Sequence, residues 1–379
     1  MTDFSKVPSP CYVLDGDLLR NNLRLISNVR QESGAEIILA FKAFAMWSAF
    51  PIIREFNFKS TASSLSEARL AFEELGSRAH TFSPAYTDNE FAKIMECSSH
   101  ITFNSLTQYK RFQPQIAHAD HPISLGIRIN PEFSVVETDL YNPCTPGSRL
   151  GIVASQLPAQ LPSNISGLHI HCLCESSAND FEALVNHVDK KFAQWIKQVK
   201  WVNFGGGHLM TRKGYDTAKL IKVIKNFREK WGVDVILEPG SAFGWETGVL
   251  VSDVVDIVEN NGISTAILNV SFACHMPDCL EMPYKPRIRG AHQEPISGLP
   301  TYRMGGNSCL SGDFVGDWSF DKPLQVGDKI IFEDMLHYTT VKTTMFNGVT
   351  HPSFAISDQK HGLRVVRTFG YEDYKARMS

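Results

Sequence analysis

Short apolar runs typical of β-strands recur eight times in the first two thirds of the chain. Between them, segments such as 65–75, 181–199 and 217–231 place apolar residues at the spacing of an amphipathic helix. Gly76 and Gly232 follow two of these segments and can take the left-handed conformation that ends a helix. Strand and helix in alternation predict a parallel sheet, and eight repeats predict a (β/α)8 barrel. The eight runs are residues 37–41, 59–62, 79–83, 101–104, 123–130, 165–171, 201–204 and 233–237.

Chemically distinctive residues lie at the ends of these runs. Lys42 follows the first run, Arg128 lies near the end of the fifth, and His171 ends the sixth. A glycine triplet at 205–207 follows the seventh run, and Glu238 follows the eighth. Because the loops that follow the strands of a barrel meet on one face, we expect these residues to form one active site.

The pattern changes after residue 248, where runs rich in Val and Ile are separated by Gly, Pro and Asp. Such runs predict a β-rich domain, and the strand-like run 11–14 needs a partner there. The predicted strands of this domain are 11–14, 249–258, 263–272, 330–334 and 353–357. The predicted domains are a barrel over residues 15–246 and a discontinuous β-rich domain over residues 1–14 and 247–379.

The composition is that of an ordinary globular protein, with 43% hydrophobic and 20% charged residues in a chain of 379. The net charge is −3, and no basic stripe with interleaved aromatic residues is present, which argues against binding to nucleic acid or an acidic membrane surface. The first ten residues lack the apolar core of a signal peptide, and no uncharged run reaches the length of a membrane span. The sequence therefore predicts a cytoplasmic protein without a nucleic-acid or membrane partner.

The eight cysteines are scattered, which predicts reduced thiols rather than a disulfide framework. Cys172 and Cys174 are separated by one residue. Structural zinc sites use two intervening residues and a second pair of ligands, and neither is found here. We therefore predict no metal.

The side chains at the strand ends have complementary chemistry. Lys42 follows an apolar strand, which favours its neutral and nucleophilic amine. The glycines at 205–207 expose backbone N–H groups that can bind a phosphate. Glu238 can keep an aromatic nitrogen protonated, and His171 offers a flat ring for stacking. Each feature alone is common in proteins without such a site, but the combination describes a site for pyridoxal 5'-phosphate.

Seven motifs in a fixed order extend this pattern along most of the chain. With them the sequence resembles the fold-type III pyridoxal-phosphate decarboxylases of the ornithine and diaminopimelate decarboxylase superfamily. The resemblance implies an alanine-racemase-like barrel followed by a β domain. Within the superfamily, the His-Cys-Leu-Cys-Glu stretch at 171–175 and the short chain are most similar to the carboxynorspermidine (carboxyspermidine) decarboxylases. The motifs are residues 39–43, 128–130, 167–171, 203–208, 237–240, 306–313 and 333–339.

The resemblance implies a role for each strand-end residue. Lys42 attaches the cofactor covalently, His171 stacks on its pyridine ring, and Glu238 pairs with the ring nitrogen. Arg128 lies close to that ring. The residues implied to hold the phosphate are Gly205, Gly206, Gly207 and Tyr338.

The resemblance also implies a homodimer with active sites shared across the interface. Cys309 corresponds to the proton donor to Cα and is contributed by the neighbouring subunit. Asp313, in the same motif, then approaches the partner's site as well. Asp278 lies where the ornithine enzymes bind the distal amine of their substrate.

Three positions depart from the superfamily pattern. Ser241 replaces an arginine, which removes a guanidinium contact to the phosphate, so that binding rests on backbone amides and Tyr338 or on a replacement such as His208. Leu310 follows Cys309 where an acidic residue is frequent. Cys174 stands where relatives often have serine, so no phosphate role is transferred to it.

The choice of substrate depends on the chemistry of its tail. Carboxynorspermidine and carboxyspermidine carry cationic nitrogens that carboxylates can bind, whereas the second carboxylate of diaminopimelate calls for arginine. We therefore predict decarboxylation of carboxynorspermidine or carboxyspermidine to norspermidine or spermidine in polyamine biosynthesis. The acidic residues available for the tail are Glu175, Asp278, Glu281 and Asp313. Arg287 and Arg303 keep a diaminopimelate or ornithine-type decarboxylase as the alternative.

Two other classes of protein are weaker alternatives. A racemase on a related barrel would need a second acid on the opposite face of Cα, for which Tyr302 and Tyr338 are available. A catalytically inactive regulator would lack Lys42 or Cys309, and both are present. The segment 133–148, rich in Pro and polar residues, is a candidate for a mobile loop.

Overall fold

A computed structural model describes residues 3–136 and 138–379, which form two compact units. The barrel unit contains residues 22–42 and 50–243, and the β unit contains the described residues up to Asn21 together with 43–49 and 244–379. The domain limits 15–246 drawn from the sequence remain our proposal for the barrel domain.

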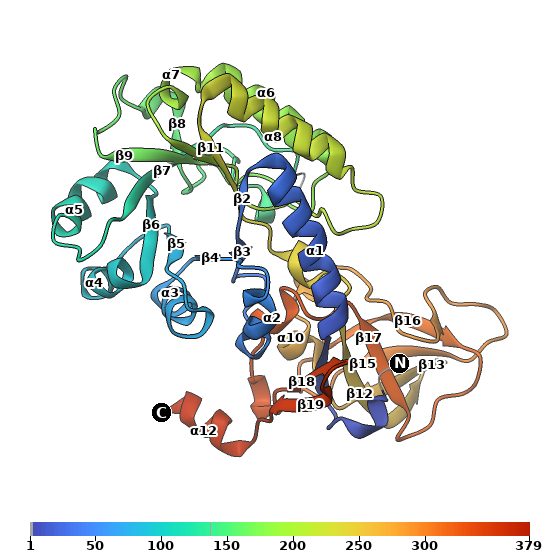
Figure 1. The fold of residues 1–379 in the computed structure, drawn as a ribbon. Helices are drawn as coiled ribbons and strands as arrows, with labels where there is room; N and C mark the ends of the chain where they lie inside the picture. The colour runs from blue at the N-terminus through green and yellow to red at the C-terminus, as the bar shows by residue number, and fades with distance from the viewer. Residues whose placement is uncertain (1–2, 137) are drawn as a thin grey trace. The chain divides into compact units, whose positions relative to one another are not determined.

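The barrel unit contains eight parallel strands, of which the first is written as two short segments, β2 and β3. Its sheet runs in the order β2-β11-β10-β9-β7-β6-β5-β4-β3, so it returns to the strand from which it starts (Figure 1). Ile38, between β2 and β3, donates its N–H to Leu237 O, and Leu39 donates to Lys59 O, each at 2.9 Å. The first strand therefore pairs on both sides, and the predicted barrel is confirmed. The strands are β2 (Glu36–Ile37), β3 (Leu39–Ala40), β4 (Ser60–Ala62), β5 (Ala79–Phe82), β6 (Ser98–Phe103), β7 (Ser124–Asn130), β9 (Ile165–His169), β10 (Trp201–Asn203) and β11 (Asp234–Leu237), with the short β8 (Ile152–Val153) beside β7.

Most helices of the barrel unit follow barrel strands, and several begin at polar caps. Ser64, Ser105 and Ser177 each accept a backbone N–H from the first turn of the helix that they precede. This satisfies donors that have no partner within the helix, and it explains why serine follows several strands. The helices are α1 (Gly16–Ser33), α2 (Phe50–Arg54), α3 (Leu65–Leu70), α4 (Asp88–Cys97), α5 (Leu106–Ile116), α6 (Ala178–Lys191), α7 (Ala193–Ile196), α8 (Thr217–Trp231) and α9 (Ser241–Gly244).

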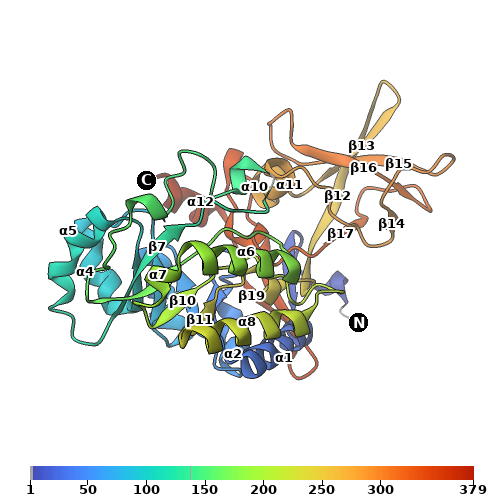
Figure 2. The same ribbon diagram turned by 90° about the horizontal axis from the view of Figure 1, so that it is seen from above.

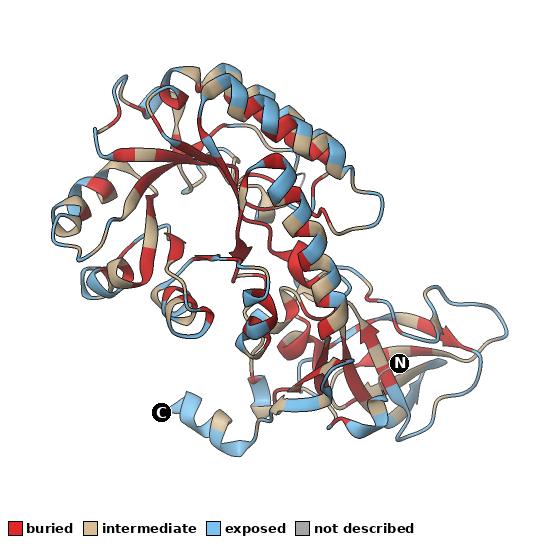
Figure 3. Ribbon diagram, viewed as in Figure 1, coloured by how far each residue is buried: buried red, intermediate tan, exposed pale blue. Residues whose placement is uncertain are grey.

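The strands of the barrel unit are mostly buried and the outer faces of its helices are exposed, as Figure 3 shows. Helices α6 and α8 lie side by side (Figures 1 and 2). Two ion pairs connect them, Lys219 to Glu182 at 2.7 Å and Lys230 to Asp189 at 2.6 Å. Exposed pairs of this kind contribute little to stability, so the apolar inner faces of the helices hold them in place.

The β unit is built around one mixed sheet in the order β14-β16-β15-β13-β12-β1-β18-β19, with β17 beside β12. Strand β1 pairs antiparallel with β12 and parallel with β18, which confirms the prediction that run 11–14 belongs to this sheet. The predicted strand 263–272 ends earlier, at Leu268, because Ser271 caps a helical turn. Figure 2 shows β12 and β13 running together as a long ribbon. The elements are β1 (Cys11–Asp15), β12 (Gly248–Asn260), β13 (Ile263–Leu268), α10 (Phe272–His275), α11 (Asp278–Glu281), β14 (Ala291–His292), β15 (Thr301–Gly305), β16 (Phe314–Phe320), β17 (Lys329–Glu333), β18 (Ser353–Asp358), β19 (Gly362–Arg367) and α12 (Tyr371–Met378).

Among residues 3–136 and 138–379, every helix is too short or too polar to cross a lipid bilayer.

An aromatic cluster fills the interior of the barrel near the start of its strands. His80 and His100 stack with their ring centroids 3.7 Å apart, and Trp201 lies edge-on to His100. A Cβ atom on Gly167 would lie 2.0 Å from Trp201 Cε2, and one on Gly126 would lie 2.4 Å from its Cη2. Glycine at both positions therefore makes room for the indole.

Acid should weaken this cluster. Burial lowers the pKa of His100 to about 4, with Glu36 opposing the shift and Lys59 adding to it. Because the folded pKa lies below that of an unfolded histidine, the neutral ring stabilises the fold above pH 6.5 and this stabilisation is lost as the pH falls toward 4. The free energy of unfolding, measured in urea, should fall between pH 7.5 and pH 5 in the wild type. We expect this fall to be about 2 kcal/mol smaller in His100→Phe. The exposed His118→Gln variant is the control; an equal loss in all three proteins would contradict the prediction.

Candidate functional site

The lysine at the end of the first barrel strand is held by a histidine from the sixth. Lys42 Nζ lies 2.9 Å from His171 Nε2. The other ring nitrogen of His171, Nδ1, accepts the N–H of Gly206 at 3.1 Å. A neutral imidazole that accepts at Nδ1 carries its proton on Nε2, so His171 donates to the lone pair of Lys42.

Burial favours the neutral form of both members of this pair. It lowers the pKa of the Lys42 ammonium, with Arg128 adding to the shift and Glu238 opposing it. Burial also lowers the pKa of His171 well below its ordinary value, and the nearby Lys42 and Arg128 add to the shift. The shift of the Lys42 pKa therefore favours the uncharged, nucleophilic amine.

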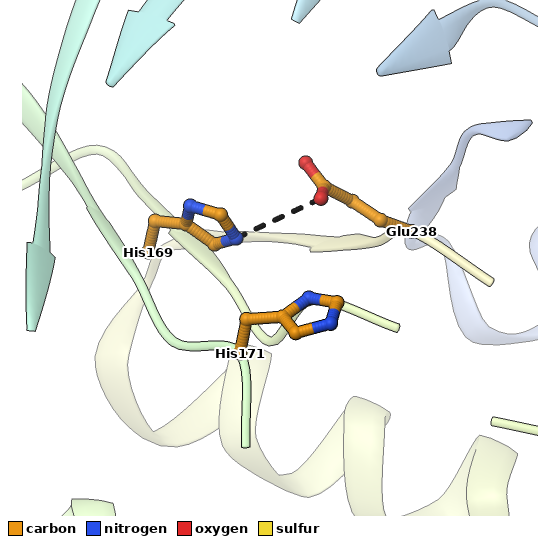
Figure 4. A group of neighbouring side chains, drawn as sticks. All are labelled: His169, His171 and Glu238. Atoms are coloured by element: carbon orange, nitrogen blue, oxygen red, sulfur yellow. Dashed lines mark ion pairs between the residues drawn. The ribbon is translucent and has the colours of Figure 1, made fainter. Parts of the chain in front are cut away.

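Glu238, at the end of the eighth barrel strand, contributes a carboxylate to the same site. Glu238 is buried, and its Oε1 accepts the Asn203 side-chain N–H at 2.7 Å. Burial raises the pKa of Glu238, while Asn203, Lys42 and Arg128 oppose the shift. His169 lies on the same side of the site, with Nε2 3.6 Å from Glu238 Oε2 (Figure 4).

The glycine triplet has a structural reason besides any ligand. A Cβ atom on Gly205 would lie 2.5 Å from His171 Nδ1, one on Gly206 would lie 2.6 Å from Glu238 O, and one on Gly207 would lie 2.4 Å from the carbonyl carbon of Leu173. The triplet thus lets three strand ends approach each other. Its amides are already in use at two positions, because Gly205 N–H donates to Asn203 Oδ1 and Gly206 N–H to His171.

Arg128 is a further polar residue of the candidate site. Its Nη2 donates to His171 O at 3.0 Å, and its guanidinium lies 4.6 Å from the centre of the Phe82 ring. Burial lowers the pKa of Arg128 to about 10. The guanidinium thus fixes the backbone that carries the His171 ring.

His169 indicates that a polar ligand belongs here. Both of its ring nitrogens are buried without a hydrogen-bond partner among the described residues. A buried polar group without a partner costs free energy, and such groups are frequent where a ligand supplies the partner. With the neutral amine of Lys42 and the buried carboxylate of Glu238, the donor set fits a planar aromatic cofactor that carries a carbonyl and a basic ring nitrogen.

The same residues also approach the geometry of a metal site. One ligand atom each from His169, His171 and Glu238 lies within 4.8 Å of the others. Both nitrogens of His171 are engaged, however, by Lys42 and by the amide of Gly206. We therefore assign no metal to this group.

The other predicted site residues lie in segments that follow the barrel strands or in the β unit. Glu175 is exposed and lies in the loop after β9, with a φ of 45°. Buried Ser241 begins α9, and His208 packs edge-on against Phe181. Five predicted residues belong to the β unit: Tyr338, Cys309, Asp313, Asp278 and Glu281.

Cys309 is exposed on a loop that is fixed from within the β unit. Its N–H donates to Asn347 Oδ1 at 2.8 Å. Asp313 is buried, and its carboxylate accepts Ser308 Oγ at 2.6 Å and Ala273 N–H at 3.0 Å. Asp313 therefore holds the loop that presents the thiol, and a contact between Asp313 and substrate stays a prediction.

Asp278 lies in a small charged cluster of the β unit. Lys342 Nζ pairs with Glu281 and lies 3.9 Å from Asp278 Oδ1. Asp278 Oδ2 accepts Thr339 Oγ1 at 3.5 Å. Burial raises the pKa of Asp278, and Lys342 opposes the shift. Tyr338 directly precedes Thr339 in the sequence. Its φ is 48°, and its N–H donates to Ala43 O at 2.7 Å.

Sequence reasoning missed three residues of the site: Asn203, His169 and Glu67. Asn203 and His169 each lie two positions before a predicted site residue, and side chains two apart on a strand share a face, so this signal was available. Glu67 accepts Ser63 N–H at 2.6 Å, and its charge opposes the lowering of the Lys42 pKa. Its place in the first turn of α3, after the capping Ser64, indicated only a helix start.

Comparison with known proteins adds to this geometry. Residues 11–335 match the family model described as the pyridoxal-dependent decarboxylase, C-terminal sheet domain. A carboxyaminopropylagmatine decarboxylase of Synechocystis sp. is 48% identical over 99% of this chain and 96% of its own length. A carboxynorspermidine/carboxyspermidine decarboxylase of Campylobacter jejuni is 46% identical over 99% of both chains. The crystal structure of carboxynorspermidine decarboxylase from Campylobacter jejuni, complexed with norspermidine, has a TM-score of 0.90 and 44% identity over 98% of this chain and 100% of that one.

Removing the amide that faces Glu238 should destabilise the protein in a pH-dependent way. In Asn203→Leu the buried carboxylate loses its donor, so we expect the pKa of Glu238 to rise further. Because the ionised form is then harder to bury, the free energy of unfolding should fall by about 1 to 3 kcal/mol at pH 7.5 and by less at pH 5. Urea unfolding measures both values, and the exposed Asn226→Leu serves as the control. The same loss at both pH values would show that Asn203 does not act through the Glu238 charge.

Proposed function

The chain belongs to the pyridoxal-dependent decarboxylase family, and from this membership we propose that it decarboxylates an amino acid with a polyamine tail, carboxynorspermidine or carboxyspermidine. The products would be norspermidine or spermidine, in polyamine biosynthesis. The observation that carries the proposal is the neutral Lys42 amine held by His171 beside the buried carboxylate of Glu238.

Pyridoxal 5'-phosphate, when bound, supplies an electron sink for the electron pair that carbon dioxide leaves on Cα. Lys42 brings the lone pair that covalent attachment of the cofactor needs, and His171 orients it through Nε2–H. Glu238, fixed by Asn203, would hold a proton on the ring nitrogen of the cofactor. The ring of His171 is available for stacking, and Arg128 holds its backbone in place.

The phosphate group has fewer candidate ligands than the sequence indicated. Since the amides of Gly205 and Gly206 donate within the protein, we propose the amide of Gly207 and the hydroxyl of Tyr338 as its ligands. Gly205 and Gly206 would then act by shaping the loop. With Ser241 in place of an arginine, no guanidinium is supplied at that position.

Cys309 is the proposed proton donor to Cα, and it would act in the site of a second subunit. Two observations support a homodimer built in this way. The thiol is exposed on a loop that Asp313 holds from within. Leu310 and Phe346, which flank the loop and its Asn347 contact, are 45% and 52% exposed, and apolar side chains of this size favour burial against a partner.

The tail of the substrate would be bound by carboxylates. Asp278 and Glu281 already hold an ammonium group, that of Lys342, so their arrangement accepts a cation. Asp313 and Glu175 remain further candidates for contacts with the tail. A guanidinium is a second candidate for the tail's end, because the relative at 48% identity is named for carboxyaminopropylagmatine.

The arginines that kept diaminopimelate open as a substrate are engaged. Arg287 pairs with Glu246 at 2.9 Å and with Glu333 at 3.5 Å. Arg303 pairs with Asp317 at 2.9 Å. Binding a second substrate carboxylate would require breaking one of these pairs, which makes a polyamine tail the better fit.

Release of carbon dioxide tests the proposal directly. The protein loaded with pyridoxal 5'-phosphate should release carbon dioxide from carboxynorspermidine and carboxyspermidine, but not from meso-diaminopimelate or ornithine. Carboxyaminopropylagmatine as a further substrate distinguishes a tail that ends in a guanidinium from one that ends in an amine. Lys42→Ala should lose the absorbance of the bound cofactor and more than about a thousandfold of the rate. Cys309→Ala should keep the absorbance and lose about a hundredfold of the rate.

The exposed Lys360→Ala variant is the matched control and should behave as the wild type. Wild-type release by Lys42→Ala would reject the role of the lysine. Preferential release from diaminopimelate would replace the polyamine substrate with the alternative.

Lys342 should compete with the substrate's own cation. In Lys342→Met the two carboxylates are free for the tail, so we expect KM for carboxynorspermidine to fall about three- to tenfold at low salt with little change in kcat. Exposed Lys322→Met is the control. A higher KM in Lys342→Met would mean that the lysine instead positions the carboxylates for binding.

A further inference from the structure

His169, the last residue of β9, lies between two polar residues of the neighbouring strands. In the register of the sheet it is level with Asn203 on β10 and with Arg128 on β7. Side chains alternate between the two faces of a sheet along each strand, so residues that are level share a face. Asn203 donates to Glu238 Oε1 at 2.7 Å, and Arg128 donates to His171 O at 3.0 Å. The partner of His169 is the open question.

The ring of His169 faces the carboxylate of Glu238, as Figure 4 shows. Its Nε2 lies 3.6 Å from Glu238 Oε2, whereas the Asn203 amide binds the other oxygen. His169 is 2% exposed and Glu238 is 6% exposed. In the described part of the chain, both ring nitrogens of His169 lack a hydrogen-bond partner. Since an unpaired buried donor costs free energy, the nearest acceptor, Glu238 Oε2, is the natural partner.

Burial favours the neutral ring of His169. It lowers the pKa of this histidine well below the ordinary value, and the positive charges of Arg128 and Lys42 add to the shift. A neutral imidazole carries one proton, on either of its nitrogens. A proton on Nε2 presents a donor to the Glu238 carboxylate, whereas a proton on Nδ1 would turn the lone pair of Nε2 toward it. The carboxylate therefore favours the form with Nε2–H.

A neutral donor suits a carboxylate that has to keep its charge. A cation would pair with Glu238 and cancel the charge, whereas an N–H group stabilises the charge and leaves it in place. The nearby Lys42 and Arg128 are engaged with His171. A separation of 3.6 Å exceeds the reach of an ordinary hydrogen bond, about 3.2 Å, but hydrogen bonds in catalytic sites are often long before a ligand binds and shorten in the complex.

We propose that His169 is a positioning residue for Glu238, and that its Nε2–H donates to Oε2 while the amide of Asn203 donates to Oε1. Held at both oxygens, the carboxylate would stay ionised and oriented to hold a proton on the ring nitrogen of the cofactor. The contact between His169 and Glu238 is argued from the barrel unit alone. Its effect on the cofactor rests on the proposed function.

A purely structural role is the competing explanation. The His169 ring packs edge-on against Phe82, with centroids 5.3 Å apart, and against His171, at 6.1 Å. A phenyl ring at this position would keep an aromatic contact and lose the donor. Glutamine would lose the ring but keep an N–H group. The variants His169→Phe and His169→Gln therefore separate packing from hydrogen bonding.

Binding of pyridoxal 5'-phosphate to the full-length apoprotein, followed by absorbance, is the first test. In His169→Phe we expect Kd to rise about tenfold, because a hydrogen bond to a charged group is lost. In His169→Gln it should stay within about threefold of the wild type. When Glu238→Gln is already present, adding His169→Phe should change Kd by less than about twofold, because the partner is gone. The exposed His118→Gln is the control.

Three results would overturn the proposal. The first is a wild-type Kd in His169→Phe. The second is an equal rise in Kd with and without Glu238→Gln, since His169 would then act independently of the carboxylate. The third is a larger rise in His169→Gln than in His169→Phe, since packing would then explain the residue.

Nuclear magnetic resonance of the apoprotein tests the contact without any cofactor. In protein labelled with 15N in its histidines, the ring signals of His169 are those lost in His169→Gln. They should show a proton on Nε2 and none on Nδ1, and the Nε2–H proton should move upfield in Glu238→Gln, where the charge is lost. A proton on Nδ1, or an Nε2–H signal that Glu238→Gln leaves in place, would contradict the contact.

The two measurements distinguish failure of this proposal from failure of the proposed function. The resonance experiment needs neither the cofactor nor the His169→Phe variant, so it decides the contact even when that variant does not fold. A wild type that binds pyridoxal 5'-phosphate but releases no carbon dioxide would reject the proposed function and leave the comparison of Kd values intact.

Discussion

Burial of two ionisable groups, a lysine and a glutamate, at one end of a closed barrel is the constraint on which this site depends. Lys42 and Glu238 come from strands that are neighbours only because the sheet returns to its first strand. Burial disfavours the charged form of each, and each opposes the shift in the other. The amine is thereby kept reactive while the carboxylate keeps partners for its charge.

The residues around Lys42 and Glu238 fix the backbone of the site, in addition to any contact with a ligand. Asn203 links Glu238 to the glycine loop, since it donates to the carboxylate and accepts the N–H of Gly205. His171 links Lys42 to the same loop through Gly206. A change at any of these positions would therefore move several others, and effects of single substitutions in this network are not expected to add.

Much of the fold could be predicted because local signals agreed with the final structure. The predicted helix 217–231 is found as α8, because Asp216 caps its start and Gly232, with a φ of 65°, ends it. Helix α5 carried the contrary signal of Pro114 within it. The strand predicted to reach residue 272 ends early, because a serine cap outweighs the apolar run.

The family, the fold class and the decarboxylase class followed from ordered motifs and are confirmed. The network could not be predicted in the same way. That Gly206 donates to His171, or that Lys342 occupies the carboxylates of the β unit, depends on side-chain positions that adjacent segments of sequence do not determine. The roles of individual site residues stay predictions until the variants are measured.

The place of strand β1 has a consequence for the order in which the newly made chain folds on the ribosome. Cys11–Asp15 pairs with Gly248–Asn260 on one side and with Ser353–Asp358 on the other. Strand β1 is therefore made before all the strands of the barrel, and its partner β18 is made after all of them. We expect the barrel to form while Cys11–Asp15 still lacks its partner β18, and the β unit to close only after Ser353–Asp358 has been made. During this interval an edge of β1 without its partner strand can pair with other chains.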